Sequence, residues 1–577
     1  MLHTLLKTRN ILIRRTHLRL LSTAPKFSDA TNIQSHTRKA IVDMFNTKAT
    51  MTEIQAETLL PGLAGDDILA RARTGTGKTV AFLVPALQNL QGNSKVEVLC
   101  VSPTRELASQ ISEQATKMLK YHPNSKKPNV QTLFGGTLKP KRDTTLFQQN
   151  QPSVLVATPG RLLSHLREGT LGPKPFDSLK VLVLDEADQL LDHGFRKEIM
   201  ELLESYVPGV SPKTKQDLTQ RPQTLLFSAT MPSGLRAVMA KAMRPNFTTV
   251  DCIGDDDTTT QGAGATHAHD QVQQHHILTE TNEDIIHASF DLLRTIIEKG
   301  NEKERTKSIG LIGPDPKMIV FLPTANLTKF YASLWAKTNE KNRKEGYRSY
   351  EMHSRKSQKQ RSRVQNIFKD VQSGILFSSD VSARGVDYPG VTHVVQIGSP
   401  PSVEQYVHRL GRTGRAGKKG TGILILTPFE KHFLTSLKSR GITCNTNTHV
   451  DILKSNVEQR KSLDQILQID AKKETGSKKD FEAGKAYQSA LGGLMGGTWP
   501  KSVSRPSKQE FVQYANSFAV AAGYADNVMP ELLARTVGKM GLKGVSNLNI
   551  VKGDVNPKYI QPKNLPKKKK KKKNRYI

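Results

Sequence analysis

The chain carries two series of short apolar runs, and each run ends in a polar or glycine-rich turn. The first series begins at Val96, Ser153, Val181 and Thr224, and the second begins at Lys317, Gly374, Thr392 and Thr421. Segments with helical spacing of apolar residues lie between the runs, as at 195–203. Continuous apolar strands that alternate with helices are typical of a parallel sheet covered on both faces. The pattern therefore predicts an α/β fold with two parallel sheets in tandem.

Composition changes along the chain indicate where these units end. A polar, glycine-containing segment separates the two series, and beyond about residue 430 apolar residues recur at helical spacing instead. Near its end the sequence has seven consecutive lysines, 567–573, which repel one another. The predicted organisation is a first α/β domain at 26–253, a linker at 254–270, a second α/β domain at 271–430, a helical C-terminal extension at 431–550 and a disordered basic tail at 551–577.

The charge balance favours a polyanionic partner. The 577 residues include 85 Lys plus Arg against 52 Asp plus Glu, a formal net charge of +33. Such an excess suits contacts with nucleic-acid phosphates, although basic residues also solvate surfaces and serve as address signals. The three cysteines are widely separated, so neither a disulfide framework nor a zinc site is expected. No run of about 18 apolar residues occurs, which argues against a membrane span.

Both ends of the chain carry possible address signals. The first 28 residues interleave Arg and Lys with Leu and Ile and contain no acid. This pattern is typical of a mitochondrial transit peptide, which we place at 1–25; the alternative is a disordered basic arm that binds nucleic acid. The lysine tail is interpreted as a non-specific tether for RNA, or alternatively as a nuclear or nucleolar signal. We expect the mitochondrial matrix, with the nucleolus as the alternative.

The stretch ARTGTGKT, residues 72–79, follows an apolar run at 67–70 and resembles a phosphate-binding loop. Gly75 and Gly77 allow backbone N–H groups to turn towards phosphate oxygens, while Lys78 supplies a cation and Thr79 a hydroxyl for Mg²⁺. The general pattern has glycine where Ala72 stands, and glycine-rich turns also occur as plain connections.

An acidic pair supplies the second half of a nucleotide site. Asp185 follows four apolar residues, so its carboxylate is expected at the sheet edge, with Glu186 next to it. Asp185 would hold Mg²⁺, and Glu186 would orient and deprotonate the attacking water. Such a pair alone is also common at a helix N-terminus, where the dipole stabilises it.

In order along the chain, these motifs resemble those of the DEAD-box family of ATP-dependent RNA helicases. The motifs are Gln55, residues 72–79, 103–108, Gly135 with Gly136, 158–161, the Asp-Glu-Ala-Asp of 185–188, 228–230, 321–324, 353–355, 379–387 and 408–415. The resemblance spans roughly residues 27–430. It implies two RecA-like domains and the use of ATP with Mg²⁺, and in this family the phosphate loop begins with alanine, as at Ala72.

The resemblance also implies roles around ATP. Gln55 would read the adenine edge, with Phe27 as a candidate to stack on the base. The implied nucleotide-binding residues are Gln55, Ala72, Arg73, Thr74, Gly75, Thr76, Gly77, Lys78, Thr79 and, at the ribose, Asp387. Arg412 and Arg415, three apart and expected on one helical turn, would be arginine fingers rather than a basic surface patch. His408 would link the two domains, and Ser228 and Thr230, otherwise ordinary strand-end hydroxyls, would couple hydrolysis to RNA binding.

The implied RNA contacts come from both domains. They are Pro103, Thr104, Arg105, Gly136, Thr158, Gly160 and Arg161 in the first domain, and Thr324, Arg355, Ser379 and Arg384 in the second. Because such residues hold the sugar-phosphate backbone, binding of structured and single-stranded RNA is expected to be largely independent of sequence. We expect a monomer, and no protein partner is indicated.

The segment 534–545 resembles the C-terminal extension of fungal mitochondrial DEAD-box chaperones that aid the splicing of group I and group II introns. The first hypothesis is therefore an ATP-dependent RNA helicase that remodels mitochondrial RNA. The alternative is an ATP-gated RNA clamp that acts as a scaffold in ribosome assembly. A DNA translocase is disfavoured by the Asp-Glu-Ala-Asp and Gln55 motifs.

Overall fold

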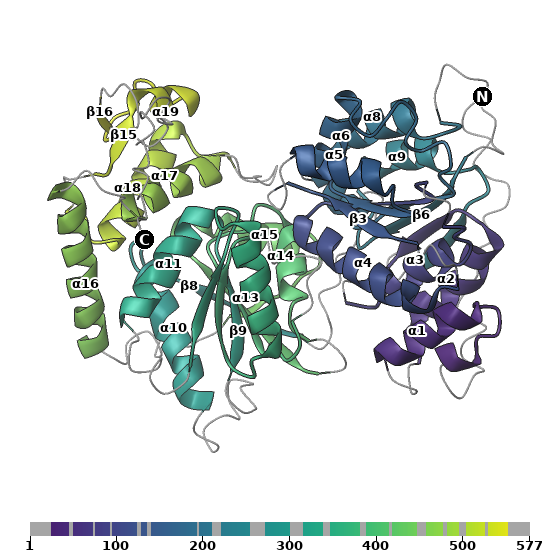
Figure 1. Ribbon diagram of the computed structural model, residues 1–577. Helices are drawn as coiled ribbons and strands as arrows, with labels where there is room; N and C mark the ends of the chain where they lie inside the picture. The colour runs from purple at the N-terminus through teal and green to yellow at the C-terminus, as the bar shows by residue number, and fades with distance from the viewer. Residues whose placement is uncertain are drawn as a thin grey trace, which may run out of the picture.

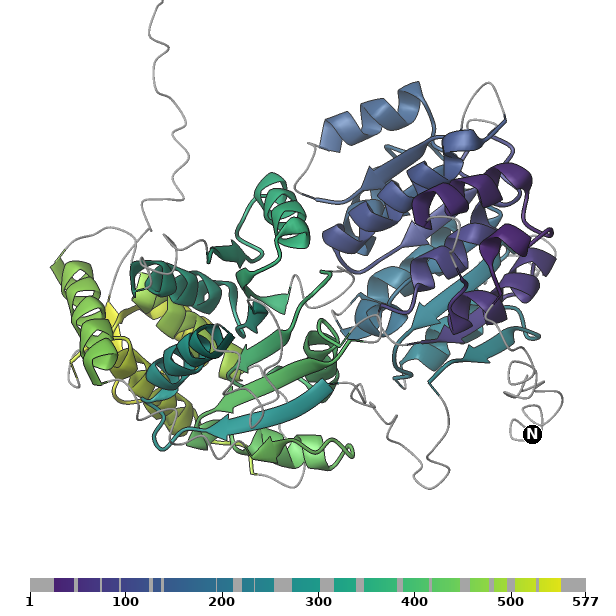
Figure 2. The same cartoon turned by 90° about the horizontal axis from the view of Figure 1, so that it is seen from below.

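Two parallel sheets and a mostly helical region make up the described part of the protein. The computed structural model describes residues 25–45, 50–72, 75–92, 95–123, 128–135, 140–192, 195–210, 221–232, 234–253, 272–300, 316–338, 347–380, 388–414, 418–446, 457–476, 482–495, 504–525 and 529–551. Two views place the second sheet between the first domain and the C-terminal region (Figures 1 and 2). This confirms the tandem α/β fold. Most of the predicted transit peptide, the linker and nearly all of the basic tail lie outside the described residues.

The first sheet has seven strands in the order β3-β4-β2-β5-β6-β1-β7. Its strands are β1 (Ile68–Arg71), β2 (Val98–Val101), β3 (Val130–Leu133), β4 (Val154–Ala157), β5 (Val181–Leu184), β6 (Gln223–Ser228) and β7 (Thr248–Asp251). Its helices are α1 (Ser35–Phe45), α2 (Glu53–Ala64), α3 (Lys78–Leu87), α4 (Arg105–Met118), α5 (Pro140–Gln149), α6 (Pro159–Arg167), α7 (Ala187–Asp192), α8 (Arg196–Tyr206) and α9 (Leu235–Ala242). Val98 and Cys100 pack towards α3 and α4, whereas Leu99 and Val101 pack towards α6 and α8. The alternation along one buried strand explains why its sequence is apolar throughout.

The second sheet repeats this arrangement in the order β10-β11-β9-β12-β13-β8-β14. Its strands are β8 (Val272–Leu278), β9 (Lys317–Phe321), β10 (Ser349–Met352), β11 (Gly374–Ser378), β12 (His393–Ile397), β13 (Gly420–Leu426) and β14 (Asn445–Thr446). Its helices are α10 (Ile285–Gly300), α11 (Ala325–Thr338), α13 (Gln358–Asp370), α14 (Val403–Leu410) and α15 (His432–Lys438). Because β14 pairs with β8, this sheet continues past the expected boundary at residue 430.

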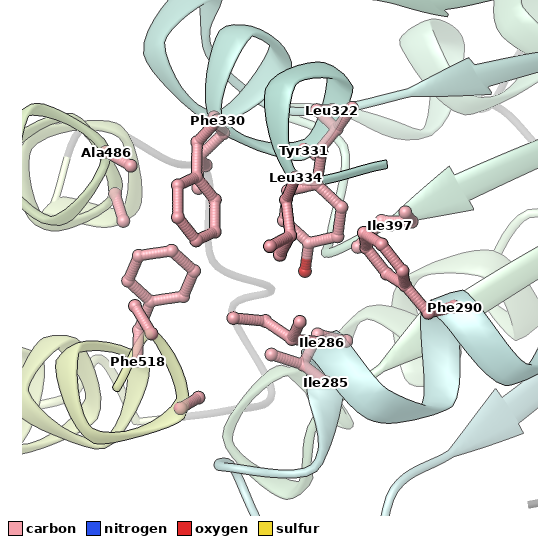
Figure 3. Close-up of a cluster of buried hydrophobic side chains, with 14 of the residues drawn as sticks. Ile285, Ile286, Phe290, Leu322, Phe330, Tyr331, Leu334, Ile397, Ala486 and Phe518 are labelled. Carbon is pink, nitrogen blue, oxygen red and sulfur yellow. The ribbon is translucent and has the colours of Figure 1, made fainter. Parts of the chain in front are cut away.

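The C-terminal region shares its core with the second sheet. It comprises α16 (Val457–Gly476), α17 (Glu482–Met495), α18 (Lys508–Ala521), β15 (Glu531–Leu533), α19 (Ala534–Lys539) and β16 (Asn549–Val551). The parallel pair β15 and β16 was not predicted from the helical spacing of this region. Figure 3 shows Phe518 of α18 facing Phe330 of α11. Their ring centroids are 5.9 Å apart, and the ring of Phe429 stacks on that of Tyr514 with a centroid distance of 4.4 Å. The extension is therefore packed as part of the second domain. Among the helices that the structure describes, none is long and apolar enough to cross a membrane.

Removing the Phe518 ring is expected to destabilise the second domain together with the extension. Phe518 is 6% exposed, and truncation of a buried Phe costs about 3 to 5 kcal/mol because it leaves a cavity. Urea unfolding of Phe518→Ala measures the loss. Phe45→Ala is the control, since Phe45 is 44% exposed and its removal is expected to change stability little. Equal losses of unfolding free energy in the two variants would show that the buried Phe518 ring stabilises the protein no more than the exposed Phe45 ring does.

Candidate functional site

The strand order of the first sheet sorts the motif residues into two groups at its carboxyl edge. The neighbouring strands β5, β6 and β1 lead into Asp185, Ser228 and Ala72. The neighbouring strands β3, β4 and β2 lead into the motifs that begin at Gly135, Thr158 and Pro103. Backbone hydrogen bonds hold these strand ends in register. Ala72 N donates to Ser228 O at 3.1 Å, and Thr158 N donates to Leu133 O at 3.1 Å. One sheet edge thus carries the nucleotide candidates and the coupling candidate Ser228 on one half and the RNA candidates on the other, at the carboxyl ends of the strands where open α/β sheets bind ligands.

The phosphate loop needs its glycines for conformation and for space. Gly75 and Gly77 have φ of +83° and +90°, a region that other residues rarely adopt. A Cβ atom on Gly77 would lie 2.3 Å from Nε2 of Gln55, so any side chain there would collide. Helix α3 begins at Lys78, directly after Gly77, so the last two residues of the loop form the N-terminus of the helix, which favours an anion. The side chains of Thr76 and Thr79 are partly buried. Arg73 and Thr74 lie outside the described residues.

Gln55 is tied to the loop. Its Nε2 donates to Gly77 O at 3.2 Å, and its Oε1 accepts from Thr52 N at 2.9 Å in a capping box that starts α2. The adenine candidate thereby fixes the phosphate loop directly. Phe27, the stacking candidate, is 3% exposed and packs in the core with Ile33.

Lys78, Asp185 and Glu186 form a buried charged cluster. Nζ of Lys78 lies 3.3 Å from Oε1 of Glu186, and Nζ makes no hydrogen bond within the described residues. Burial, followed by the charge of Glu186, raises the pKa of Asp185, and Lys78 partly opposes this. Glu186 has φ of +49°, an uncommon backbone conformation outside glycine, and its Oε2 accepts from Gln189 Nε2 at 3.1 Å. The glycine cradle, a buried ammonium, the Thr79 hydroxyl and the Asp185 carboxylate fit a nucleoside triphosphate with Mg²⁺.

Asp188 connects this cluster with the second domain. Its Oδ2 accepts from Thr230 N at 3.1 Å and Thr230 Oγ1 at 2.9 Å, while its backbone N donates to Ser228 Oγ at 3.3 Å. Nε2 of His408, on α14 of the second domain, lies 3.8 Å from the same Oδ2. The structure therefore brings Ser228, Thr230 and His408 together around one buried carboxylate.

A second contact between the domains involves residues that sequence reasoning missed. Nη1 of Arg361 lies 2.7 Å from Oε1 of Glu106, on α4, in an ion pair, and Nε2 of Gln358 donates to the same oxygen at 3.3 Å; Arg361 and Gln358 are both on α13. Both charged side chains are buried, at 2% and 5% exposure. Glu106 lies inside the quoted motif 103–108, but nothing in its sequence context indicated a partner in the other domain.

Arg412 does not lie on the helical turn that was expected there. Helix α14 ends at Leu410, and Gly414 has φ of +67°, which is incompatible with a continuing helix. Arg412 is buried, and its Nε donates to His408 O at 3.3 Å. Arg415 and Asp387 lie outside the described residues, so the predicted finger pair and ribose contact stay predictions.

The first-domain RNA candidates lie at the ends of β2 and β4. Thr104 caps α4 by accepting from Leu107 N at 3.3 Å, with Pro103 buried before it. Arg105 packs against Gly135, where a Cβ atom would lie 3.0 Å from its Nη2. Thr158 stands at the N-cap position of α6 without a capping bond from its side chain. Gly160 is exposed and Arg161 is bound to Asp143 in the first turns of this helix, while Gly136 lies outside the described residues.

The second-domain candidates follow β9, β10 and β11, which are again neighbours. Oγ1 of Thr324 lies 2.8 Å from Oγ of Ser489 on α17, so the extension touches this motif. Arg355 is exposed, and its backbone N donates to His353 Nδ1 at 3.2 Å. Ser379 N donates to Met352 O at 3.1 Å, and this hydrogen bond joins the carboxyl ends of β10 and β11. Arg384 lies outside the described residues.

Comparisons with known proteins agree over both domains. A family model described as DEAD/DEAH box helicase matches residues 52–238, and one described as helicase conserved C-terminal domain matches residues 303–417. The DEAD-box ATP-dependent RNA helicase 26 of Oryza sativa subsp. japonica is 37% identical over 517 residues, which cover 89% of this chain and 84% of the relative.

Two further similarities extend beyond the two domains. The mitochondrial ATP-dependent RNA helicase MSS116 of Phaeosphaeria nodorum is 37% identical over 508 residues, covering 87% of this chain and 82% of the relative. A solved structure of Mss116p without its NTE and C-tail, bound to single-stranded RNA and AMP-PNP, matches with a TM-score of 0.71 and 26% identity. That match covers 90% of this chain and 95% of the other.

Proposed function

The chain belongs to the DEAD-box family of ATP-dependent RNA helicases, and from that premise we propose that it acts as an RNA chaperone in mitochondria. It uses ATP with Mg²⁺ and binds RNA. Its specific work would be the local unwinding and remodelling of structured RNA, in intron splicing and RNA metabolism. The observation that carries the chaperone proposal is the contact of Thr324 with Ser489. Through this contact the C-terminal extension lies beside a candidate RNA-binding residue of the helicase core.

The roles at the ATP site follow from the buried cluster. The N–H groups of the phosphate loop and Lys78 would bind the phosphates, and Gln55 would bind the adenine edge. Thr79 and Asp185 would hold Mg²⁺, which would supply positive charge opposite the phosphates. Glu186 would accept the proton of the attacking water. Arg412 and Arg415 would stabilise the charge that develops on the transferred phosphate, once the second domain has closed over the first.

The roles at the RNA site rest on the sheet edges. The candidates at the ends of β2 and β4 and those after β9, β10 and β11 are backbone amides, hydroxyls and arginines, which suit phosphate and sugar. Binding would therefore be largely independent of sequence, with 2′-hydroxyl contacts favouring RNA over DNA. The Asp188 and Glu106 contacts between the domains give ATP and RNA a physical route by which each influences the other's binding.

The mitochondrial part of the proposal has two supports. The basic, acid-free N-terminal segment has the composition of a transit peptide. A relative named as mitochondrial aligns over 87% of this chain. Sequencing of RNA crosslinked to the protein in cells tests compartment and substrate together. Mitochondrial intron RNA is the expected result, whereas nuclear pre-ribosomal RNA would overturn the assignment.

Hydrolysis is expected to be necessary for the chaperone activity. A misfolded intron RNA is incubated with ATP and either wild-type protein or Glu186→Gln, and recovery of its native fold is followed over time. We expect wild-type protein to restore the fold in repeated cycles and the variant to bind RNA without restoring it, because release requires hydrolysis. Equal recovery with both proteins would instead favour an ATP-gated clamp that acts as a scaffold.

A further inference from the structure

Asp143, on α5, lies at the centre of a buried polar cluster that has no role in the nucleotide site. Its Oδ2 accepts from Nε and Nη2 of Arg161 at 2.9 Å and 2.6 Å. Nε2 of His165 lies 3.5 Å from the same oxygen, and His165 Nδ1 lies 2.8 Å from Thr170 Oγ1. Arg161 and His165 are four residues apart on α6, so Asp143 faces one side of that helix.

The contact restricts the Arg161 side chain strongly. Asp143 is 1% exposed and the Arg161 side chain is 14% exposed, so the pair is largely removed from water. Two bonds to one edge of a planar guanidinium fix its position and its plane. The carboxylate therefore determines where the Nη1 end of Arg161 points. Without that charge, a long arginine side chain would sample several rotamers and lose entropy on meeting a ligand.

Asp143 also connects two neighbouring segments that lead into RNA candidates, strand β3 and helix α6. Helix α5 lies between the glycine pair after β3 and the start of β4. The backbone O of Asp143 accepts from Gln131 Nε2, on β3, at 3.1 Å, while its side chain holds α6, which follows β4. Gly135, at the end of the same β3 segment, packs against Arg105. Asp143 thus joins β3 to the helix that follows the neighbouring strand β4.

We propose that Asp143 is a positioning residue for RNA binding: it holds the Arg161 guanidinium in the orientation that meets the RNA backbone and locks α6 against α5. The inference rests on the proposed role of Arg161 as an RNA contact. In this role Asp143 acts through Arg161.

Asp143→Asn tests the proposal, since asparagine keeps the size of the side chain and removes its charge. The ATPase rate is measured against RNA concentration and, separately, against ATP concentration. We expect the RNA concentration for half-maximal rate to rise about tenfold, with the KM for ATP and the kcat at saturating RNA unchanged. Asp143→Glu is expected to recover part of the RNA affinity. Asp177→Asn is the control, because the Asp177 carboxylate forms an exposed ion pair with Lys174.

A double-mutant comparison separates positioning from general damage. In an Arg161→Ala background, Asp143→Asn is expected to add less than about twofold, because the group through which it acts is gone. A further tenfold loss in that background, or a fall in kcat together with the melting temperature, would show a merely structural role and overturn the proposal. If Arg161→Ala raises the half-maximal RNA concentration and Asp143→Asn does not, the positioning role fails alone. If Arg161→Ala changes nothing, the RNA role of Arg161 fails as well.

Discussion

Glu186→Gln is expected to hydrolyse ATP about 10² to 10⁴ times more slowly than the wild-type protein while binding it at least as tightly. Glutamine has nearly the shape of glutamate, so its amide oxygen can replace Oε2 in accepting from Gln189, but it cannot take a proton from water. The charge of Glu186 also raises the pKa of Asp185. Removing that charge favours the ionised form of Asp185, which is the form that binds a cation.

Single-turnover hydrolysis and equilibrium binding of Mg²⁺-ATP measure the two halves of this expectation. Asp185→Asn is the matched variant, since it alters the neighbouring carboxylate and is expected to weaken Mg²⁺-ATP binding as well as hydrolysis. A Glu186→Gln protein that retains hydrolysis within about tenfold of wild type would remove Glu186 from the role of general base.

Arg361→Ala is expected to lower RNA-stimulated ATP hydrolysis about 100-fold. Removing one partner of a buried ion pair costs about 3 to 5 kcal/mol, because the other charge stays buried and unpaired. Here the abandoned charge is Glu106, whose side-chain partners Arg361 and Gln358 both belong to the other domain. The cost therefore falls on the closed arrangement of the domains and is absent when they separate. About 1.4 kcal/mol corresponds to each tenfold change, so 100-fold is a conservative expectation.

The matched control is Arg167→Ala, which breaks an ion pair with Glu201 on the surface of the first domain. This arginine side chain is 56% exposed, so little change is expected. The double variant Glu106→Ala with Arg361→Ala is expected to be more active than Arg361→Ala alone, because no unpaired charge remains. A loss of activity without RNA equal to the loss with RNA would place the effect inside one domain rather than between the two.

The apolar runs of the sequence predicted those strands that are buried on both faces of a sheet. The eight runs that begin at Val96, Ser153, Val181, Thr224, Lys317, Gly374, Thr392 and Thr421 all contain strands of the two sheets. The strands that were not predicted include β3, β7, β10 and β14, which are the four edge strands. An edge strand keeps exposed residues, as in Val130–Leu133, where only Leu133 is fully buried. Such strands lack a continuous apolar run and are missed by that criterion.

The site could be predicted only as far as local motifs reach. Lys78 and Glu186 were expected to share one site, and Nζ of Lys78 lies 3.3 Å from Oε1 of Glu186. Glu106 with Arg361 and Asp143 with Arg161 were not predicted, because each pair joins helices that are brought together only by packing. The helical turn predicted through Arg412 was wrong: α14 ends at Leu410 with Gly411 as its C-cap, and the positive φ of Gly414 does not allow a helix to continue there.

The most direct test of the account is the release of a labelled strand from a short RNA duplex with a single-stranded extension, with and without ATP. We expect fast release by the wild-type protein only when ATP and Mg²⁺ are present, and release slowed about 100-fold in Arg361→Ala. Release that proceeds equally well without ATP, or that is unchanged in Arg361→Ala, would contradict the claim that domain closure couples ATP to RNA strand separation.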